Sequence, residues 1–156
     1  MRYEYIDPII TSTVFVLDQL LQTDVRRGDV KLQASSKIDI DTAVVLTLGN
    51  NAKHVGSVVL NMKDETAKKV STAMHKMLGI KGDDGIDMDV ISEMGNMVAG
   101  NIISTLNNKG CNLNISTPSV LSKDSLRKGY LSLESLNIPL YSEIGEMLVS
   151  VNISTD

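Results

Sequence analysis

The sequence predicts a single domain of the α/β class, α+β type, in which a mostly antiparallel sheet packs against long helices. The chain has 156 residues, enough for one domain with a real core, and we take 1–156 as that domain. Three stretches repeat their apolar residues at helical spacing, whereas others alternate apolar and polar residues as half-buried strands do. Because short turn sequences join the alternating stretches, we expect mostly antiparallel pairing.

The first expected helix starts at the dipeptide Asp7-Pro8. Asp7 suits the N-cap position, and Pro8 suits the first helical position, where its missing N–H does no harm. The helix should run to about Thr23. Its expected apolar stripe consists of Ile10, Val14, Leu17 and Leu21.

Strand-like alternation begins after this helix. The stretches 43–48 and 54–62 flank a Gly-Asn-Asn sequence at 49–51, which is a turn signal. These three segments therefore predict an antiparallel hairpin. A shorter alternating stretch precedes them and has its apolar positions at Val30, Leu32 and Ala34.

A second helix is expected between Asp64, a suitable cap, and Gly79, a suitable helix end. Its apolar stripe is most simply core packing and comprises Ala67, Val70, Met74, Met77 and Leu78. The acidic segment that follows invites a calcium-loop interpretation. We reject it because Ile91 occupies the next ligand position after Asp87 and Asp89, and the required glycine is absent. The acidic residues of this segment are better explained as loop and N-cap residues: Asp83, Asp84 and Asp87.

The third expected helix, 87–107, carries the most suggestive side chains. At about 100° per residue, one narrow stripe contains Asp89, Glu93, Asn96, Gly100 and Asn107. The opposite side presents Ile91, Met94, Val98 and Ile102. A carboxylate and an amide on successive turns can enter one partner cleft together. Gly100 leaves bare backbone on the same stripe, which favours a close approach there, although a solvated polar face is the default for such a helix.

The end of the chain predicts further strands. The sequence at 107–110 is typical of a helix end, and a strand at 111–116 should follow. We interpret 119–129 as a loop or a short helical turn. The last stretch, 138–154, alternates on both sides of Gly145 and predicts a closing hairpin.

Composition argues against several classes of partner. The net charge is −4, aromatic residues make up only 3%, and basic residues form no large cluster, so we expect no nucleic acid. No stretch approaches the roughly 18 apolar residues that span a bilayer, so we expect a soluble, cytoplasmic protein. The lone Cys111 reads as a small core residue, and His54 and His75 read as structural.

A longer pattern on the third helix adds a family resemblance. The motif Asp89-x-x-x-Glu93-x-x-Asn96, with Pro118 downstream, resembles the signature of the CheC/CheX family of chemotaxis phosphatases. The expected order of elements and the closing hairpin around Gly145 are similar to that family as well. Because the first helix lacks a Glu-x-x-Asn pair, the chain resembles the single-site CheX branch rather than a two-site CheC protein.

The resemblance implies hydrolysis of the aspartyl phosphate of a response regulator such as CheY, in chemotaxis or another two-component system. Glu93 would form an ion pair with the regulator's lysine, and Asn96 would orient the attacking water. An amide suits that task because it both donates and accepts hydrogen bonds. Mg²⁺ would belong to the regulator, so the chain needs no cofactor or metal of its own. The family also implies a homodimer.

Other interpretations stay open at this stage. Asp89 and Gly100 are expected on the partner-binding surface beside Glu93 and Asn96, but neither Asp89 nor Pro118 is assigned a chemical step, and structural roles are favoured for both. A non-catalytic module that binds and sequesters a receiver domain would use the same surface. A small-ligand sensor is a third hypothesis, for which the sequence offers no glycine-rich phosphate loop.

Overall fold

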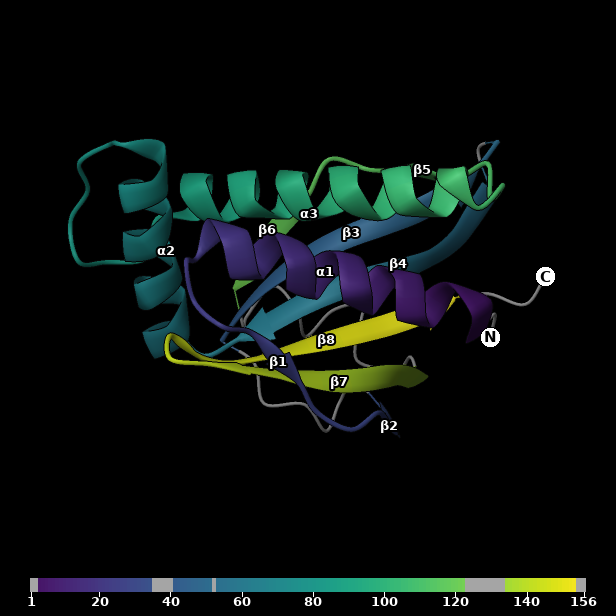
Figure 1. Cartoon of the computed structure of the whole chain (residues 1–156), viewed down its shortest axis with the longest axis horizontal. Coiled ribbons are helices and arrows are strands. Elements are labelled where there is room, and N and C mark those ends of the chain that lie inside the picture. Colours follow the sequence, from purple (N-terminus) through teal and green to yellow (C-terminus); the bar gives the residue numbers. More distant parts are fainter. Residues whose placement is uncertain (1–2, 35–40, 52, 123–133, 154–156) are drawn as a thin grey trace.

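The computed structural model describes residues 3–34, 41–51, 53–122 and 134–153. Within them, an eight-stranded antiparallel sheet is covered by three α-helices (Figure 1), which confirms the predicted fold class. A 3₁₀ turn at Tyr3–Tyr5 leads into α1 (Ile6–Leu20), and the other helices are α2 (Asp64–Leu78) and α3 (Met88–Asn108). The strands are β1 (Arg26–Arg27), β2 (Lys31–Ala34), β3 (Thr42–Asn50), β4 (Lys53–Met62), β5 (Asn114–Ile115), β6 (Ser119–Ser122), β7 (Glu134–Ser142) and β8 (Gly145–Ile153).

The sheet runs in the order β1-β7-β8-β4-β3-β5, with β2 also paired to β7 and β6 also paired to β3. Each outer edge is therefore made of two short strands. At one edge, β1 and β2 pair with β7 on either side of Pro139. Pro139 has no N–H to donate to a neighbouring strand, which accounts for the break between β1 and β2. The amide of Gly28, between β1 and β2, still donates to the Pro139 carbonyl at 2.8 Å.

One face of the sheet and the inner sides of the helices form the core. Alternate residues of the strands point toward the helices and are fully buried there, including Val44, Leu46, Val58, Leu60, Val149 and Val151. Helices α1 and α3 lie side by side along this face, while α2 stands at one end, near the β7–β8 turn (Figure 1). The Ser12 hydroxyl of α1 donates to Thr105 Oγ1 of α3 at 3.0 Å, which links the two long helices.

Both predicted hairpins are present. Strands β3 and β4 pair from Thr42 and Met62 to the turn at Asn51, whose φ of +48° is the left-handed conformation that such turns require. Strands β7 and β8 pair up to Gly145, where φ is +137°. Gly49 lies within β3, next to a bulge, rather than in the turn itself.

The expected first helix is shifted. It starts at Ile6, after an N-cap at Tyr5, so the prediction that Asp7 is the cap is wrong. The 3₁₀ turn supplies an earlier entry into the helix, and the exposed Asp7 carboxylate instead accepts from Arg27 at 3.4 Å. The helix ends at Leu20 rather than near Thr23 because Gln22 adopts a left-handed φ of +49°.

The second helix ends at Gly79 as predicted, but Asp64 is its first residue and Lys63 its N-cap. The amide of Asp64 is satisfied by Asp41 Oδ2 at 3.0 Å. Leu78, expected in the core, is 38% exposed. The inner face of this helix instead includes Ser71 and His75, both buried.

The later strands differ from the prediction in their bounds. Of the expected strand at 111–116, only Asn114–Ile115 has strand conformation, and Cys111 lies half-buried in the loop before it. Residues 119–122, expected in a loop, form β6 and pair with β3. The exposed Ser119 and Ser122 at its two ends suit an exposed sheet edge, and pairing with a strand some 75 residues earlier cannot be recognised from the local sequence. The remainder of that expected loop, 123–129, lies outside the described residues.

The short strand predicted around 30–34 exists as β2, but Leu32 of this strand and Val30 just before it do not join the core. Leu32 is 61% exposed and Val30 is 43% exposed at the outer edge of the sheet. Among the described residues, the helices are all too short or too polar to cross a membrane.

Candidate active site

Helix α3 begins at a strong N-terminal cap. The Asp87 carboxylate accepts hydrogen bonds from the backbone amides of Asp89 at 3.0 Å and Val90 at 3.4 Å, which satisfies two donors that a helix start leaves unpaired. The sequence prediction that Asp87 is the N-cap is confirmed. The helix then runs without a break to Asn108, and Gly110, with a φ of +87°, follows its end.

The two faces of α3 match the predicted stripes. Its outward residues are exposed: Asp89, Glu93, Asn96, Gly100 and Asn107. Its inward residues include four fully buried apolar side chains: Ile91, Met94, Val98 and Ile102. Because the inner face is packed over several turns, the carboxylate of Glu93 and the amide of Asn96 stand on a rigid support.

Asn107 shares the outward stripe but differs from Asn96 in what its amide does. The Asn107 Nδ2 group donates to the Leu113 carbonyl at 3.0 Å, and Oδ1 accepts from the Leu113 amide at 2.8 Å. These two bonds fix the loop that follows the helix. The Asn107 amide therefore has a structural partner inside the chain.

Pro118, the downstream member of the motif, is buried and lies against the inner side of α3. It immediately precedes β6, the edge strand that pairs with β3. The structural role favoured for Pro118 agrees with this position. Asp89 is exposed in the first turn of the helix, so it lies on the same surface as Glu93 and Asn96.

The start of α3 is tied to α2 through His75. The ring Nε2 of His75 lies 2.7 Å from Asp87 Oδ2, and Ser71 Oγ accepts from the Asp87 amide at 2.9 Å. The hydrogen bond from His75 is the main cause that lowers the pKa of the Asp87 carboxyl; burial opposes it, and the amides of Val90 and Asp89 reinforce it. The sequence indicated a structural His75 but offered no signal for its partner, because the two residues lie on different helices.

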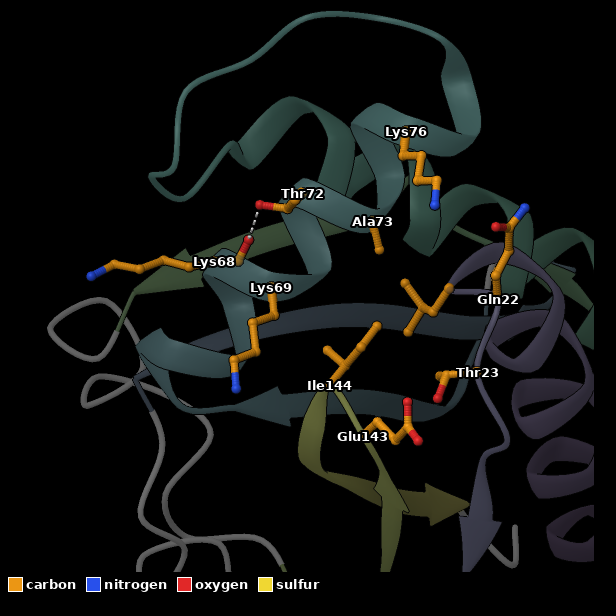
Figure 2. Close-up of a pocket in the computed structure, with 10 residues that line it drawn as sticks. Gln22, Thr23, Lys68, Lys69, Thr72, Ala73, Lys76, Glu143 and Ile144 are labelled. Carbon is orange, nitrogen blue, oxygen red and sulfur yellow. Dashed lines mark hydrogen bonds between the residues drawn. The ribbon is translucent and has the colours of Figure 1, made fainter.

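Two hollows of the described surface differ in their distance from this helix: one lies away from it, and the other reaches its first turn. The larger one, about 480 Å³, lies between the end of α1, the side of α2 and the β7–β8 turn (Figure 2). Its wall includes Lys69 and Lys76 of α2, with Ile144 at its centre and Glu143 across from them. None of the motif residues lines it.

A second hollow, about 320 Å³, lies at the start of α3 and reaches Asp87 and Asp89. Within the part of the chain that the structure describes, no three His, Cys, Asp or Glu side chains are grouped as a metal site would need. The Glu93–Asn96 pair is exposed on the outward face of α3. Such a pair does chemistry only when another molecule supplies the opposing groups.

Together, the antiparallel sheet, its paired long helices and the exposed carboxylate and amide on α3 define an α+β domain of the CheC/CheX type. The family model described as chemotaxis phosphatase CheX matches residues 42–140, more than half of the chain. The protein therefore belongs to the CheX family of chemotaxis phosphatases.

Individual relatives agree with this assignment. Over 144 residues, 92% of each chain, the sequence is 28% identical to the CheY-P phosphatase CheX of Thermotoga maritima. A chemotaxis protein CheX from Desulfovibrio desulfuricans has the same fold, with a TM-score of 0.76 and 24% identity over 97% of this chain and 99% of that one. The CheX in a CheX–CheY–BeF₃–Mg²⁺ complex from Borrelia burgdorferi gives a TM-score of 0.72 and 24% identity, with the same coverage.

Proposed function

We propose that the protein hydrolyses the aspartyl phosphate of a CheY-like response regulator in chemotaxis or another two-component pathway. Membership of the CheX family supports this proposal, as does similarity to a protein named CheY-P phosphatase. The observation that carries it is the exposed Glu93–Asn96 pair on a helix whose opposite face is packed into the core. A solvent-facing carboxylate and amide one helical turn apart are suited to a phosphoryl group that another protein brings.

In this proposal Asn96 is the catalytic residue. Its amide, inserted beside the acyl phosphate, accepts a hydrogen bond from a water molecule and donates one to the phosphoryl group or its surroundings. The water is thereby held in line with the bond to be broken. A bond forms between the water oxygen and phosphorus, the bond to the aspartyl oxygen breaks, and that electron pair stays on the aspartate carboxylate. The two protons of the water stay with the released phosphate. The products are inorganic phosphate and the unmodified regulator.

Glu93 serves as the anchor. Its carboxylate would pair with the lysine of the regulator's phosphorylation site, one helical turn from the point where Asn96 enters. The regulator would hold its own Mg²⁺, which would supply neutralisation of the phosphoryl charge. Asp89 and Gly100 would contact the partner on either side of the pair, Asp89 through its charge and Gly100 by allowing close approach of the partner's backbone or side chains.

We further propose that residues 1–156 act as one cytoplasmic domain and that the protein is a homodimer. The continuous core that joins all three helices to the sheet supports the single domain. The exposed apolar residues at the β2 edge, Leu32 and Val30, are consistent with a contact between copies through sheet edges. Light scattering of the purified protein at several concentrations tests the dimer directly.

The test of the activity is the decay of a phosphorylated CheY-like regulator in Mg²⁺, with the protein at catalytic concentration. The wild type should accelerate phosphate release. Asn96→Ala should lose on the order of 100-fold or more in turnover, as removal of one positioned polar group typically does. Its affinity for the regulator should stay within about threefold of wild type because Glu93 carries the ion pair. Glu93→Ala should instead weaken association.

The competing function is a module that sequesters the regulator without hydrolysing its phosphate. In that case wild type and Asn96→Ala would bind equally, and neither would accelerate decay with any regulator that binds. Full activity of both the Asn96→Ala and Glu93→Ala variants would show that the site has been assigned to the wrong residues.

A further inference from the structure

Two glycines of helix α3, Gly95 and Gly100, lie near Glu93 and Asn96 but differ in their surroundings. Among the described residues, and apart from the neighbouring helix backbone, no atom would lie within 4 Å of a Cβ added at Gly100. A Cβ on Gly95 would lie 2.7 Å from Val44 Cγ1, and 3.1 and 3.2 Å from Cβ and Cγ of Pro118. Gly95 is thus the point where the helix backbone comes down onto the sheet.

Val44 and Pro118, which form the floor beneath Gly95, are both rigid side chains. Val44 is fully buried in β3, and its β-branched side chain has little freedom to rotate away. Pro118 is a buried ring that directly precedes β6, whose residue Val120 pairs with Val44. Neither contact atom is the end of a long flexible side chain, so an added methyl group would have to move the helix rather than its neighbours.

Gly95 lies between Glu93 and Asn96 in the chain, on the inner side of the same turn. Any lift of the helix at Gly95 is therefore transmitted directly to both outward side chains. Real Cβ atoms essentially never lie closer than 3.0 Å to another heavy atom, and the distance from the added Cβ to Val44 Cγ1 would be 2.7 Å. The lift caused by one methyl group would be several tenths of an ångström.

We propose that Gly95, seated on Val44 and Pro118, is a positioning residue that sets the height of Glu93 and Asn96 above the sheet and hence the reach of Asn96 into the partner. This inference rests on the proposed phosphatase function. It also assigns a purpose to Pro118, which forms part of the floor and takes no chemical step.

The two outward residues differ in how they tolerate a lift. An ion pair such as that of Glu93 weakens gradually with distance, and its long side chain can adjust. The orientation of a water by Asn96 depends steeply on geometry, since a misplacement of about 1 Å can cost on the order of 100-fold in rate. A change at Gly95 should therefore reduce kcat much more than it raises KM.

The test compares four proteins in steady-state dephosphorylation and thermal unfolding: wild type, Gly95→Ala, Val44→Ala and the double variant. Gly95→Ala should lower kcat by about tenfold or more while KM stays within about twofold. Val44→Ala removes the nearest clashing atom. The double variant should accordingly recover kcat to within about threefold of Val44→Ala, and it should unfold at a higher temperature than Val44→Ala because the new methyl group refills the space.

Each outcome has a distinct meaning. A wild-type kcat in folded Gly95→Ala would overturn the positioning role and leave the phosphatase intact. A lower kcat that Val44→Ala does not rescue, with additive effects on unfolding, would also overturn it, because the loss would not pass through this contact. Absence of turnover by wild type would refute the proposed function itself and the positioning role with it. If Gly95→Ala does not fold, Gly95→Ala combined with Pro118→Ala gives the same rescue test from the other side of the floor.

Discussion

His75 of α2 and Asp87 at the start of α3 are joined by a hydrogen bond of 2.7 Å between Nε2 and Oδ2. His75 is buried, and the Asp87 side chain is 34% exposed. The same carboxylate caps α3, so one side chain both starts the helix that carries Glu93 and Asn96 and holds it against its neighbour. The orientation of the candidate site therefore depends on a contact outside it.

This contact predicts a pH-dependent contribution to stability. Since the pKa of Asp87 is lowered in the folded protein, its stabilising effect is fully present above the unfolded value of about 3.9 and is lost as the pH falls through the folded value. Asp87→Asn keeps a good cap but removes the titrating group. The difference in free energy of unfolding between wild type and Asp87→Asn should shrink as the pH is lowered from about 5 to about 3.

Urea unfolding followed by circular dichroism across that range measures the difference. Asp84→Asn is the matched control because it removes an exposed carboxylate from the loop before α3. The prediction would be contradicted if the difference in free energy of unfolding between wild type and Asp87→Asn stayed constant from neutral to acid pH.

Asn107 and Asn96 should respond differently to the same substitution. Asn107→Ala removes both bonds to the Leu113 backbone and should lower the free energy of unfolding by about 1–2 kcal/mol. Its kcat should match that of wild type when measured well below the unfolding temperature, because its amide is engaged inside the chain. Asn108→Ala, at the next exposed position, serves as the control for loss of an asparagine at the helix end. A large fall in kcat for Asn107→Ala would place that residue in the site instead.

Gly100 offers a test of the partner surface that is free of internal clashes. Gly100→Ala should raise the free energy of unfolding by up to about 1 kcal/mol, since alanine favours the helix and, apart from the neighbouring helix backbone, no atom of the described residues lies within 4 Å of the new methyl group. If the regulator approaches the bare backbone there, the same variant should bind it several-fold more weakly. Titration calorimetry with the regulator and thermal unfolding of the free variant separate the two effects. A more stable variant with unchanged affinity would remove Gly100 from the interface.

Much of the candidate site was predictable from local sequence, because a helix imposes its own geometry on neighbouring residues. The period of 3.6 residues correctly placed Ile91, Met94 and Val98 inside and Glu93 and Asn96 outside. The Asp87 cap was predictable for the same reason, since its bonds reach only two and three residues along the chain. The catalytic roles of the pair came from the family resemblance and stay predictions.

Tertiary structure decided what depends on residues distant in the chain. The strand at 119–122 could not be recognised from its own sequence because it forms by pairing with β3. The exposure of Leu78 depends on how α2 packs against the rest of the fold. The bond of His75 to Asp87 likewise requires two helices to meet. In the sequence, Gly95 is one small residue between two polar ones. The proposed role of Gly95 depends on Val44 of β3 and Pro118, which lie 2.7–3.2 Å from where a Cβ would be added. Such close packing is a property of three segments brought together, and no single segment encodes it.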